Sequence, residues 1–409
     1  AQPKAPDDRS VLSGWILAAA TTRPPPSGLP RPTPCSLPTP CPLPCLAVDR
    51  AKNCESIWDS YKEAIEECDE GQFTECEGLY DRSSYKSKAT GEPGPEVMKT
   101  IMKEIRKDLP KNIELSANAS MFVRYDDEKP QFMQACLTGV QGTPYESGCF
   151  MFDIYMPDTY PQTNCLVTHV TKNASMVSAN NGPGGFSPNL HRDTGKVCLS
   201  LLGTWNGPGW EAGKSNVYQV LSSILWMILG AEHPYYMEPS YGGWEGTAPQ
   251  SNHVPEVKVY DEAVYFGTAK WAILEQMKTP PVGFEEVVMA HFREKKKVIM
   301  NCVQVWHDKG TDGLKTKLAP VIEELAAEFA KLMTVEDAQQ ELSEAQLEVN
   351  FILEKIQYLE AKVKAAGKDA KLKVPKAYRR LKMGPQLLEQ AQDRVKVRNP
   401  AARMQAQAR

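Results

Sequence analysis

Apolar residues with helical spacing open the central part of the chain, between residues 95 and 108. They are separated by three or four positions, which predicts an amphipathic helix. The apolar stripe consists of Val97, Met98, Ile101, Met102 and Ile105. The remaining face carries Lys99, Lys103, Arg106 and Lys107. We therefore expect a helix that buries one side and presents basic side chains on the other.

Alternation of apolar and polar residues follows in four short segments bounded by turn residues, a pattern typical of β-strands. The segments are residues 121–125, 132–140, 149–156 and 166–171. In the third segment, one face carries Phe150, Phe152, Ile154 and Met156, and the other carries Asp153 and Tyr155. Short links between successive strands predict a four-stranded antiparallel meander.

A long stretch without periodicity separates this meander from the strongest helical stripe of the chain. It runs from the glycine-rich residues 182–185 to about residue 214. The stripe that follows consists of Val217, Val220, Leu221, Ile224, Leu225, Ile228 and Leu229. Later helical spacing predicts a helical extension over residues 281–333. The order of helix, four strands, irregular segment and helices predicts an α+β fold.

A heptad pattern near the C-terminus predicts a coiled-coil helix of about three heptads over residues 335–366. Its seam positions are Leu342, Ala345, Val349, Ile352, Ile356, Leu359 and Val363. Self-association or a partner helix through residues 342–363 would cover this seam. The alternative is a single amphipathic helix that folds back on its own domain.

Prolines crowd residues 21–47, and their fixed φ and missing N–H favour extended, solvated chain over a packed element. We expect a proline-rich disordered tail over residues 1–50. An acidic helical segment and linker follows over residues 51–94, with a short helix around Tyr61. The tail cysteines have no nearby histidine and no paired CxxC spacing, so neither a metal nor a cofactor is predicted there. They are Cys35, Cys41 and Cys45.

Charge is almost balanced over the whole chain, with 47 Lys and Arg against 51 Asp and Glu. From residue 361 onward there are 14 basic and 3 acidic residues, or +11, which leaves −15 for the rest of the net −4. The whole-chain charge excludes a typical nucleic-acid-binding protein. The basic tail, residues 367–409, is either a solvated run or a contact for an anionic partner or RNA.

Eleven cysteines are scattered through apolar segments, unlike the spaced framework of a small secreted protein. A reducing compartment, the cytoplasm or the nucleus, is the expectation. Residues 1–20 leave open a remnant of an organellar targeting segment. No apolar run reaches the roughly 18 residues that a membrane-spanning helix needs, so no membrane contact is predicted.

The irregular segment holds the clearest chemical signal, a cysteine within a set of spaced motifs. Tyr160-Pro161, Pro188-Asn189, Gly195-x-x-Cys198 and Trp205 occur in this order after the predicted helix and meander. The arrangement resembles the active-site region of ubiquitin-conjugating enzymes (E2), with a UBC domain over residues 95–278. Further phrases are similar to the large E2 domains, such as that of the giant inhibitor-of-apoptosis protein BRUCE. They include Gly142-Thr143-Pro144-Tyr145, Gly195-Lys196-Val197-Cys198-Leu199-Ser200 and Trp271-Ala272-Ile273-Leu274-Glu275-Gln276.

The resemblance implies a UBC fold in which Cys198 carries ubiquitin, or a ubiquitin-like protein, as a thioester. The carrier receives it from an E1 activating enzyme and passes it to a lysine amine. A thiol suits this task because its thiolate attacks activated acyl groups well and also leaves well. By the same resemblance, Asn189 stabilises the acyl oxygen or holds the loop in place. Glu238, after the long helix, is the candidate for favouring removal of the lysine proton.

The basic helix face also acquires a role from the resemblance, because the corresponding face in E2 enzymes meets the E1. Its candidate contacts are Lys99, Lys103 and Arg106. An E3 ligase is a further partner that the sequence leaves open. Without the resemblance, this face is an ordinary solvated surface.

Several positions depart from the usual E2 pattern. Tyr160-Pro161 continues as Gln162-Thr163-Asn164-Cys165 and lacks the usual diproline. The interval from Asn189 to Cys198 is one residue longer than usual, near Thr194. Ser187 takes the place of the usual histidine, a position that is not histidine in the large E2 group either.

Two other interpretations stay open at this point. A cysteine flanked by Val197 and Leu199 is, without its context, often a buried core residue. The whole domain is alternatively a catalytically weak or inert UBC-fold subunit that serves binding or scaffolding in a larger assembly.

Overall fold

The computed structural model describes residues 59–89, 91–177, 185–237 and 254–332, together with residues 343, 346, 347, 350 and 351. The proline-rich tail, Glu238, the basic tail and most of the predicted coiled coil lie outside these residues, and those predictions stay predictions. No helix among the described residues is long and apolar enough to cross a membrane.

A five-stranded sheet with the strand order β1-β2-β3-β4-β5 forms the centre of the molecule. The strands are β1 (Phe73–Cys76), β2 (Met121–Asp126), β3 (Phe132–Thr138), β4 (Cys149–Tyr155) and β5 (Leu166–His169). Strands β2 to β5 pair antiparallel in succession, which confirms the predicted meander. Strand β1 was not predicted: it pairs parallel with β2, with Phe73 opposite Val123. Part of the predicted linker 51–94 is therefore an edge of the sheet.

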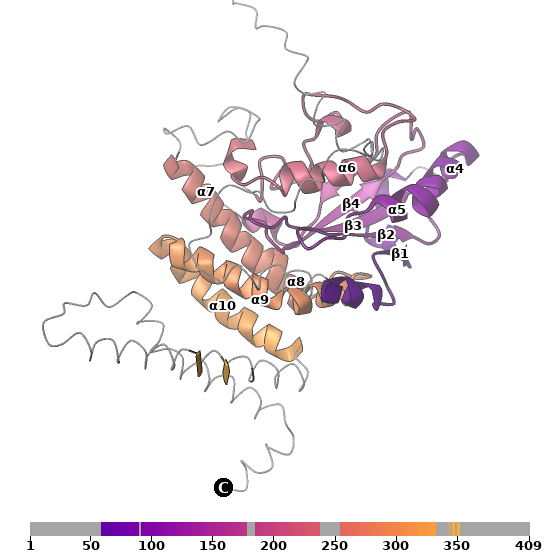
Figure 1. Ribbon diagram of the computed structural model, residues 1–409. Coiled ribbons are helices and arrows are strands. Elements are labelled where there is room, and N and C mark those ends of the chain that lie inside the picture. Colours follow the sequence, from indigo (N-terminus) through magenta and orange to yellow (C-terminus); the bar gives the residue numbers. More distant parts are fainter. Residues whose placement is uncertain are drawn as a thin grey trace, which may run out of the picture.

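The predicted basic helix and the helix of the strong apolar stripe cover one face of the sheet (Figure 1). The first helix comprises α4 (Pro95–Lys103), a π-helical turn (Glu104–Asp108) and α5 (Leu109–Asn112). The second comprises α6 (Val217–Ser223) and a further π-helical turn (Ile224–Ile228). Their buried residues meet the sheet in one core that includes Ile101, Ile105, Phe150, Phe152, Leu221 and Ile224.

The C-terminal helices cover the opposite face of the sheet (Figure 1). They are α8 (Glu275–Lys278), α9 (Glu285–Lys309) and α10 (Asp312–Leu332). Before them come α7 (Val254–Gly267), whose buried residues belong to the first core, and a π-helical segment (Thr268–Leu274), which contributes to both cores. A second core joins Phe122 and Met151 of the sheet to residues such as Phe292 of α9. The predicted helical extension 281–333 thus contains α9 and α10, packed against the domain.

Strand β4 is buried along its whole length because both faces of the sheet are covered. Even the polar Asp153 is only 2% exposed. Its carboxylate accepts hydrogen bonds from the backbone N–H of Ser84, at 2.7 Å, and from the side-chain amide of Gln134, at 2.7 Å. These two hydrogen bonds satisfy the buried carboxylate. From the alternating pattern alone, Asp153 would be expected at the surface.

Besides a helix over residues 59–66, around Tyr61 as predicted, the described chain contains several short helical turns. Two precede the first long helix, α3 (Leu79–Arg82) and a 3-10 turn (Lys86–Lys88). Three more 3-10 turns lie in the connections after β5, at Ala174–Met176, Ser200–Leu202 and Pro234–Met237. Leu79 and Tyr85, at the first two turns, pack with Phe132 and Tyr155 in a third, smaller core.

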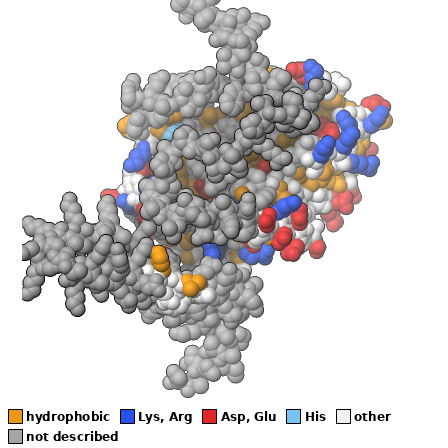
Figure 2. Space-filling model, in the orientation of Figure 1, with side chains coloured by type: hydrophobic (Ala, Val, Ile, Leu, Met, Phe, Trp, Pro, Cys, Tyr) orange, Lys and Arg blue, Asp and Glu red, His pale blue; other side chains and the backbone are white. Residues whose placement is uncertain are grey.

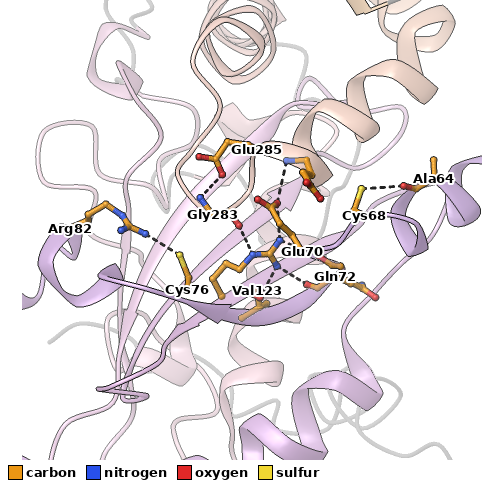
Figure 3. Close-up of polar contacts among 12 residues, drawn as sticks. Ala64, Cys68, Glu70, Gln72, Cys76, Arg82, Val123, Gly283 and Glu285 are labelled. Carbon is orange, nitrogen blue, oxygen red and sulfur yellow. Dashed lines mark hydrogen bonds and ion pairs between the residues drawn. The ribbon is translucent and has the colours of Figure 1, made fainter. Parts of the chain in front are cut away.

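At a junction where Glu70 and Gly283 lie close together (Figure 3), a fully buried arginine, Arg124 of β2, ties the sheet to the segment before α9. Its guanidinium donates to the backbone carbonyls of Gly71 and Gly283, and its Nη2 lies 3.5 Å from the Glu70 carboxylate. Its Cζ lies 4.7 Å from the centre of the Phe284 ring. Burial lowers the pKa of Arg124, and Glu70 counteracts this effect. The N-terminal edge of the sheet and the C-terminal helices therefore share one polar junction.

Candidate active site

Cys198 lies on one arm of a short hairpin that the irregular segment forms. The Cys198 N–H donates to the carbonyl of Asn189 at 2.8 Å, and the His191 N–H donates to the carbonyl of Lys196 at 2.9 Å. Leu190 and Val197 pair antiparallel between them. The hairpin brings two of the predicted site residues, Asn189 and Cys198, directly together.

A glycine attaches this hairpin to the edge strand of the sheet. The His169 N–H of β5 donates to the Gly195 carbonyl at 2.8 Å. Gly195 has a φ of +66°, and a Cβ atom there would lie 2.2 Å from the His169 carbonyl oxygen. Only glycine combines this conformation with so close a backbone approach.

The extra residue near Thr194 is accommodated in the turn of the hairpin. The backbone N–H of Thr194 lies 3.3 Å from Nδ1 of His191, and its hydroxyl lies 3.0 Å from the same atom. The arms on either side still pair, as the contact between Asn189 and Cys198 shows. The longer interval therefore does not separate these two residues.

Asn189 is almost fully buried and directs its amide at the peptide group of the cysteine. Its Nδ2 donates to the Cys198 carbonyl at 2.9 Å. Its Oδ1 is buried and has no hydrogen-bond partner among the described residues. In this arrangement the side chain is hydrogen-bonded within the loop, and both roles that the resemblance implies stay predictions.

Ser187 is fully buried at the position where most E2 enzymes have histidine. Its Oγ accepts a hydrogen bond from the Asn189 N–H at 3.2 Å. Its carbonyl accepts one from the Leu190 N–H at 2.9 Å. A small hydroxyl side chain thus shapes the turn that presents Asn189.

The exposure of Cys198 distinguishes it from the core cysteines. Cys198 is half-buried, whereas Cys136, Cys149 and Cys165 are buried. Its neighbours Val197 and Leu199 are 1% and 4% exposed, so side chains alternate between the core and the surface along this arm. Burial raises the pKa of the Cys165 thiol, which disfavours its thiolate. The structure thus places Cys198 at the surface side of its arm, unlike the core residue of the alternative interpretation.

A buried carboxylate, Glu104, fixes the surroundings of the Tyr160-Pro161 motif. Glu104 accepts hydrogen bonds from the Tyr160 hydroxyl and from the Val217 N–H at the start of α6. Burial raises the pKa of Glu104, and these two donors counteract the rise. The indole of Trp210 donates to the Pro161 carbonyl at 2.7 Å. The sequence motifs did not reveal Glu104, because its partners lie far along the chain.

The loop after α6 contains a second feature that the sequence did not reveal. In this loop, His233 Nδ1 lies 2.7 Å from Oδ2 of Asp261, a buried residue of α7. The hydrogen bond to this carboxylate raises the pKa of His233. Glu238, the predicted acid of the same loop, lies outside the described residues, so its placement is not tested.

The predicted E1-binding residues are exposed along the outer side of the first helix. Lys99 lies 3.7 Å from Glu96, and Lys103 lies 3.8 Å from Asp108. Arg106 is likewise exposed. Figure 2 shows basic side chains intermixed with acidic ones at the end of the molecule where α4 lies. Within the described part of the chain, no cluster of His, Cys, Asp and Glu could hold a metal ion.

Comparisons with known proteins agree with the fold. The family model described as ubiquitin-conjugating enzyme matches residues 100–240. The putative ubiquitin-conjugating enzyme E2 38 of Arabidopsis thaliana is 30% identical over 283 residues, which are 64% of this chain and 82% of that relative. The chain therefore belongs to the ubiquitin-conjugating enzyme family.

Two further relatives are much longer proteins. The probable ubiquitin-conjugating enzyme E2 R521 of Acanthamoeba polyphaga mimivirus is 35% identical over 235 residues, covering 56% of this chain and 16% of that protein. The human dual E2 ubiquitin-conjugating enzyme/E3 ubiquitin-protein ligase BIRC6 is 40% identical over 198 residues, covering 48% and 4%. The likeness to BRUCE, another name for BIRC6, is thus confirmed. The chain spans only a small part of these two relatives.

Proposed function

We propose that the protein accepts ubiquitin, or a ubiquitin-like protein, from an E1 as a thioester on Cys198 and transfers it to a lysine amine. The observation that supports this most is the partly exposed Cys198 on a hairpin pinned by Asn189, within a chain of the E2 family. The hairpin holds the peptide of Cys198 in place while its side chain lies toward the surface.

Both chemical steps exchange one bond at the acyl carbon. In the first, the Cys198 thiolate attacks the thioester carbonyl on the E1, and the E1 thiolate leaves. In the second, a lysine amine attacks the new thioester, the Cys198 thiolate leaves and the amine loses a proton. Asn189 keeps the reacting segment in place, and Glu238 is proposed to favour the proton removal.

The remaining roles in this proposal are contacts with partner proteins. Lys99, Lys103 and Arg106 supply the exposed basic face that we assign to E1 contact. An E3 ligase that selects the substrate is the further partner of this proposal.

A thioester assay tests the assignment. Incubation with E1, ATP and ubiquitin should give an adduct that a reducing agent removes. Cys198→Ala should abolish the adduct, and Cys198→Ser should give an ester that resists the reducing agent. Cys68→Ala, at another half-buried cysteine, should leave the adduct unchanged.

Two results would count against the proposal. An adduct on Cys198→Ala would show that another residue is the carrier. No adduct with any of a panel of activating enzymes and modifiers would favour the alternative of an inert UBC-fold binding subunit.

A further inference from the structure

The hydroxyl of Thr204 holds the backbone on both sides of Cys198. Its Oγ1 accepts a hydrogen bond from the Leu199 N–H at 2.9 Å. The same hydroxyl donates to the Val197 carbonyl at 2.7 Å. One side chain thus joins the peptide group before the cysteine to the peptide group after it.

Asn189 holds the same segment through the two backbone groups of Cys198 itself, its N–H and its carbonyl. Its carbonyl accepts from the Cys198 N–H at 2.8 Å, and its Nδ2 donates to the Cys198 carbonyl at 2.9 Å. In extended chain, the N–H and C=O of one residue point to one side, and the adjoining C=O and N–H of its neighbours point to the other. Asn189 and Thr204 therefore hold the cysteine backbone from opposite sides.

A tight turn after the cysteine returns Thr204 to this position. The Leu202 N–H donates to the Leu199 carbonyl at 3.0 Å, and the Thr204 N–H donates to the same carbonyl at 3.2 Å. Gly203 ends the 3-10 turn with a φ of +65° and a ψ of 15°. The turn thus fixes the backbone of Thr204, which leaves its hydroxyl little freedom relative to Cys198.

We propose that Thr204 is a positioning residue, which orients the Cys198 thiol for attack on the incoming thioester and for release to the amine. The inference rests on the proposed function. Both steps depend on the direction of the Cys198 Cα–Cβ bond, because reacting atoms must approach within a narrow range of angles and distances. Loss of the hydroxyl therefore slows loading and discharge together.

The test compares Thr204→Val, which keeps the shape and removes the hydroxyl, with Thr204→Ser, which keeps the hydroxyl. In single-turnover assays, Thr204→Val should lower the rate constants of loading and of discharge to free lysine by about tenfold to a hundredfold. The fraction of molecules that become charged should stay as in the unaltered protein. Thr204→Ser should restore most of both rates.

A merely structural role predicts a different result. It would reduce the fraction of protein that becomes charged and leave the rate constants of the active molecules unchanged. That result, or unaltered rates in Thr204→Val, would overturn the inference.

Gly203→Ala provides a second variant if Thr204→Val does not fold. No atom lies within 4 Å of the new Cβ, so the substitution only strains the positive φ of the turn. It should shift Thr204 and lower both rates in the same direction, to a smaller extent. Unaltered rates in a folded Gly203→Ala would contradict the proposed role.

Alkylation of Cys198 by iodoacetamide, followed by mass spectrometry, separates this inference from the proposed function. Loosening of the segment should expose the half-buried thiol, so Thr204→Val should alkylate faster at Cys198 even though it loads more slowly. If no activating enzyme charges the unaltered protein, the proposed function fails. The alkylation rate still decides the inference, and an unchanged rate in Thr204→Val would overturn it.

Discussion

At the scale of single residues, the site consists mainly of groups that hold the backbone around one thiol. Asn189 directs its amide at the Cys198 carbonyl, 2.9 Å away. Its buried position, only 3% exposed, restricts the amide to this role in the resting protein. The side chain is therefore hydrogen-bonded to the cysteine backbone in this structure, and its proposed role toward the acyl oxygen stays a prediction.

Asn189→Ala should consequently slow E1-dependent loading as well as discharge to lysine. The variant leaves the Cys198 carbonyl without its donor, so the free energy of unfolding should fall by about 1 kcal/mol. Single-turnover rates and urea unfolding measure the two effects. A matched control is Gln72→Ala, whose amide donates to the Glu114 and Met121 carbonyls far from the hairpin. Slowed discharge with normal loading would show instead that Asn189 acts only on the acyl oxygen.

The sequence allowed Cys198 and Asn189 to be singled out because their motifs occur in a recognisable order. It did not indicate Thr204, and it marked Ser187 only as a departure from the usual histidine. A hydroxyl that bonds across a turn leaves no periodic signal, and its partners are backbone groups that every residue has. Glu104 was missed for a related reason: a single acid in an amphipathic helix reads as a solvated residue until its distant partners Tyr160 and Val217 are known.

At the scale of elements, the sheet has one strand more than the alternating pattern predicts, and helices cover both of its faces. Strand β1 has only four residues, and its partner β2 lies about fifty residues later along the chain. Neither its length nor its neighbours reveal such a parallel strand. The helical stripes of α9 and α10 predict that each helix buries one face, but they do not say against what.

Arg124→Met tests the junction between these elements. The substitution removes the donor of the Gly71 and Gly283 carbonyls and takes from Glu70 its cationic partner, which leaves the Glu286 N–H as a donor to its carboxylate. We expect the free energy of unfolding to fall by about 3–5 kcal/mol, measured by urea denaturation. Arg106→Met, at an exposed arginine, should change it by no more than about 0.5 kcal/mol. A similarly small change for Arg124→Met would mean that apolar packing with Phe284 alone supports the junction.

At the scale of the whole molecule, two buried histidines link stability to pH. Burial lowers the pKa of His169 to about 3 and that of His291 to about 4. His291 is satisfied by Tyr61 and by the Ser147 carbonyl, whereas His169 Nε2 has no partner among the described residues. In the unfolded chain both side chains take up a proton near pH 6.5. The unfolded state therefore binds more protons below this pH, and stability falls as the pH falls.

His169→Phe should remove one of these two contributions, because phenylalanine fits among Phe150, Phe152 and Phe186 without titrating. The difference in unfolding free energy between the variant and the unaltered protein should grow as the pH falls from 6.5 to 5. Its slope should approach about 1.4 kcal/mol per pH unit in favour of the variant. Urea unfolding at several pH values measures it, and groups common to both proteins cancel. A pH-independent difference would show that His169 is not kept neutral by the fold.

The position of α9 and α10 late in the chain has a consequence for biosynthesis. When the ribosome has made the chain as far as residue 278, the face that carries Phe122 and Met151 still lacks α9 and α10. The nascent chain therefore exposes an apolar sheet face until roughly fifty more residues have emerged, and such surfaces attract chaperones or aggregate. Truncated products that end near residue 278 should depend on chaperones for solubility, even though they contain every residue of the hairpin.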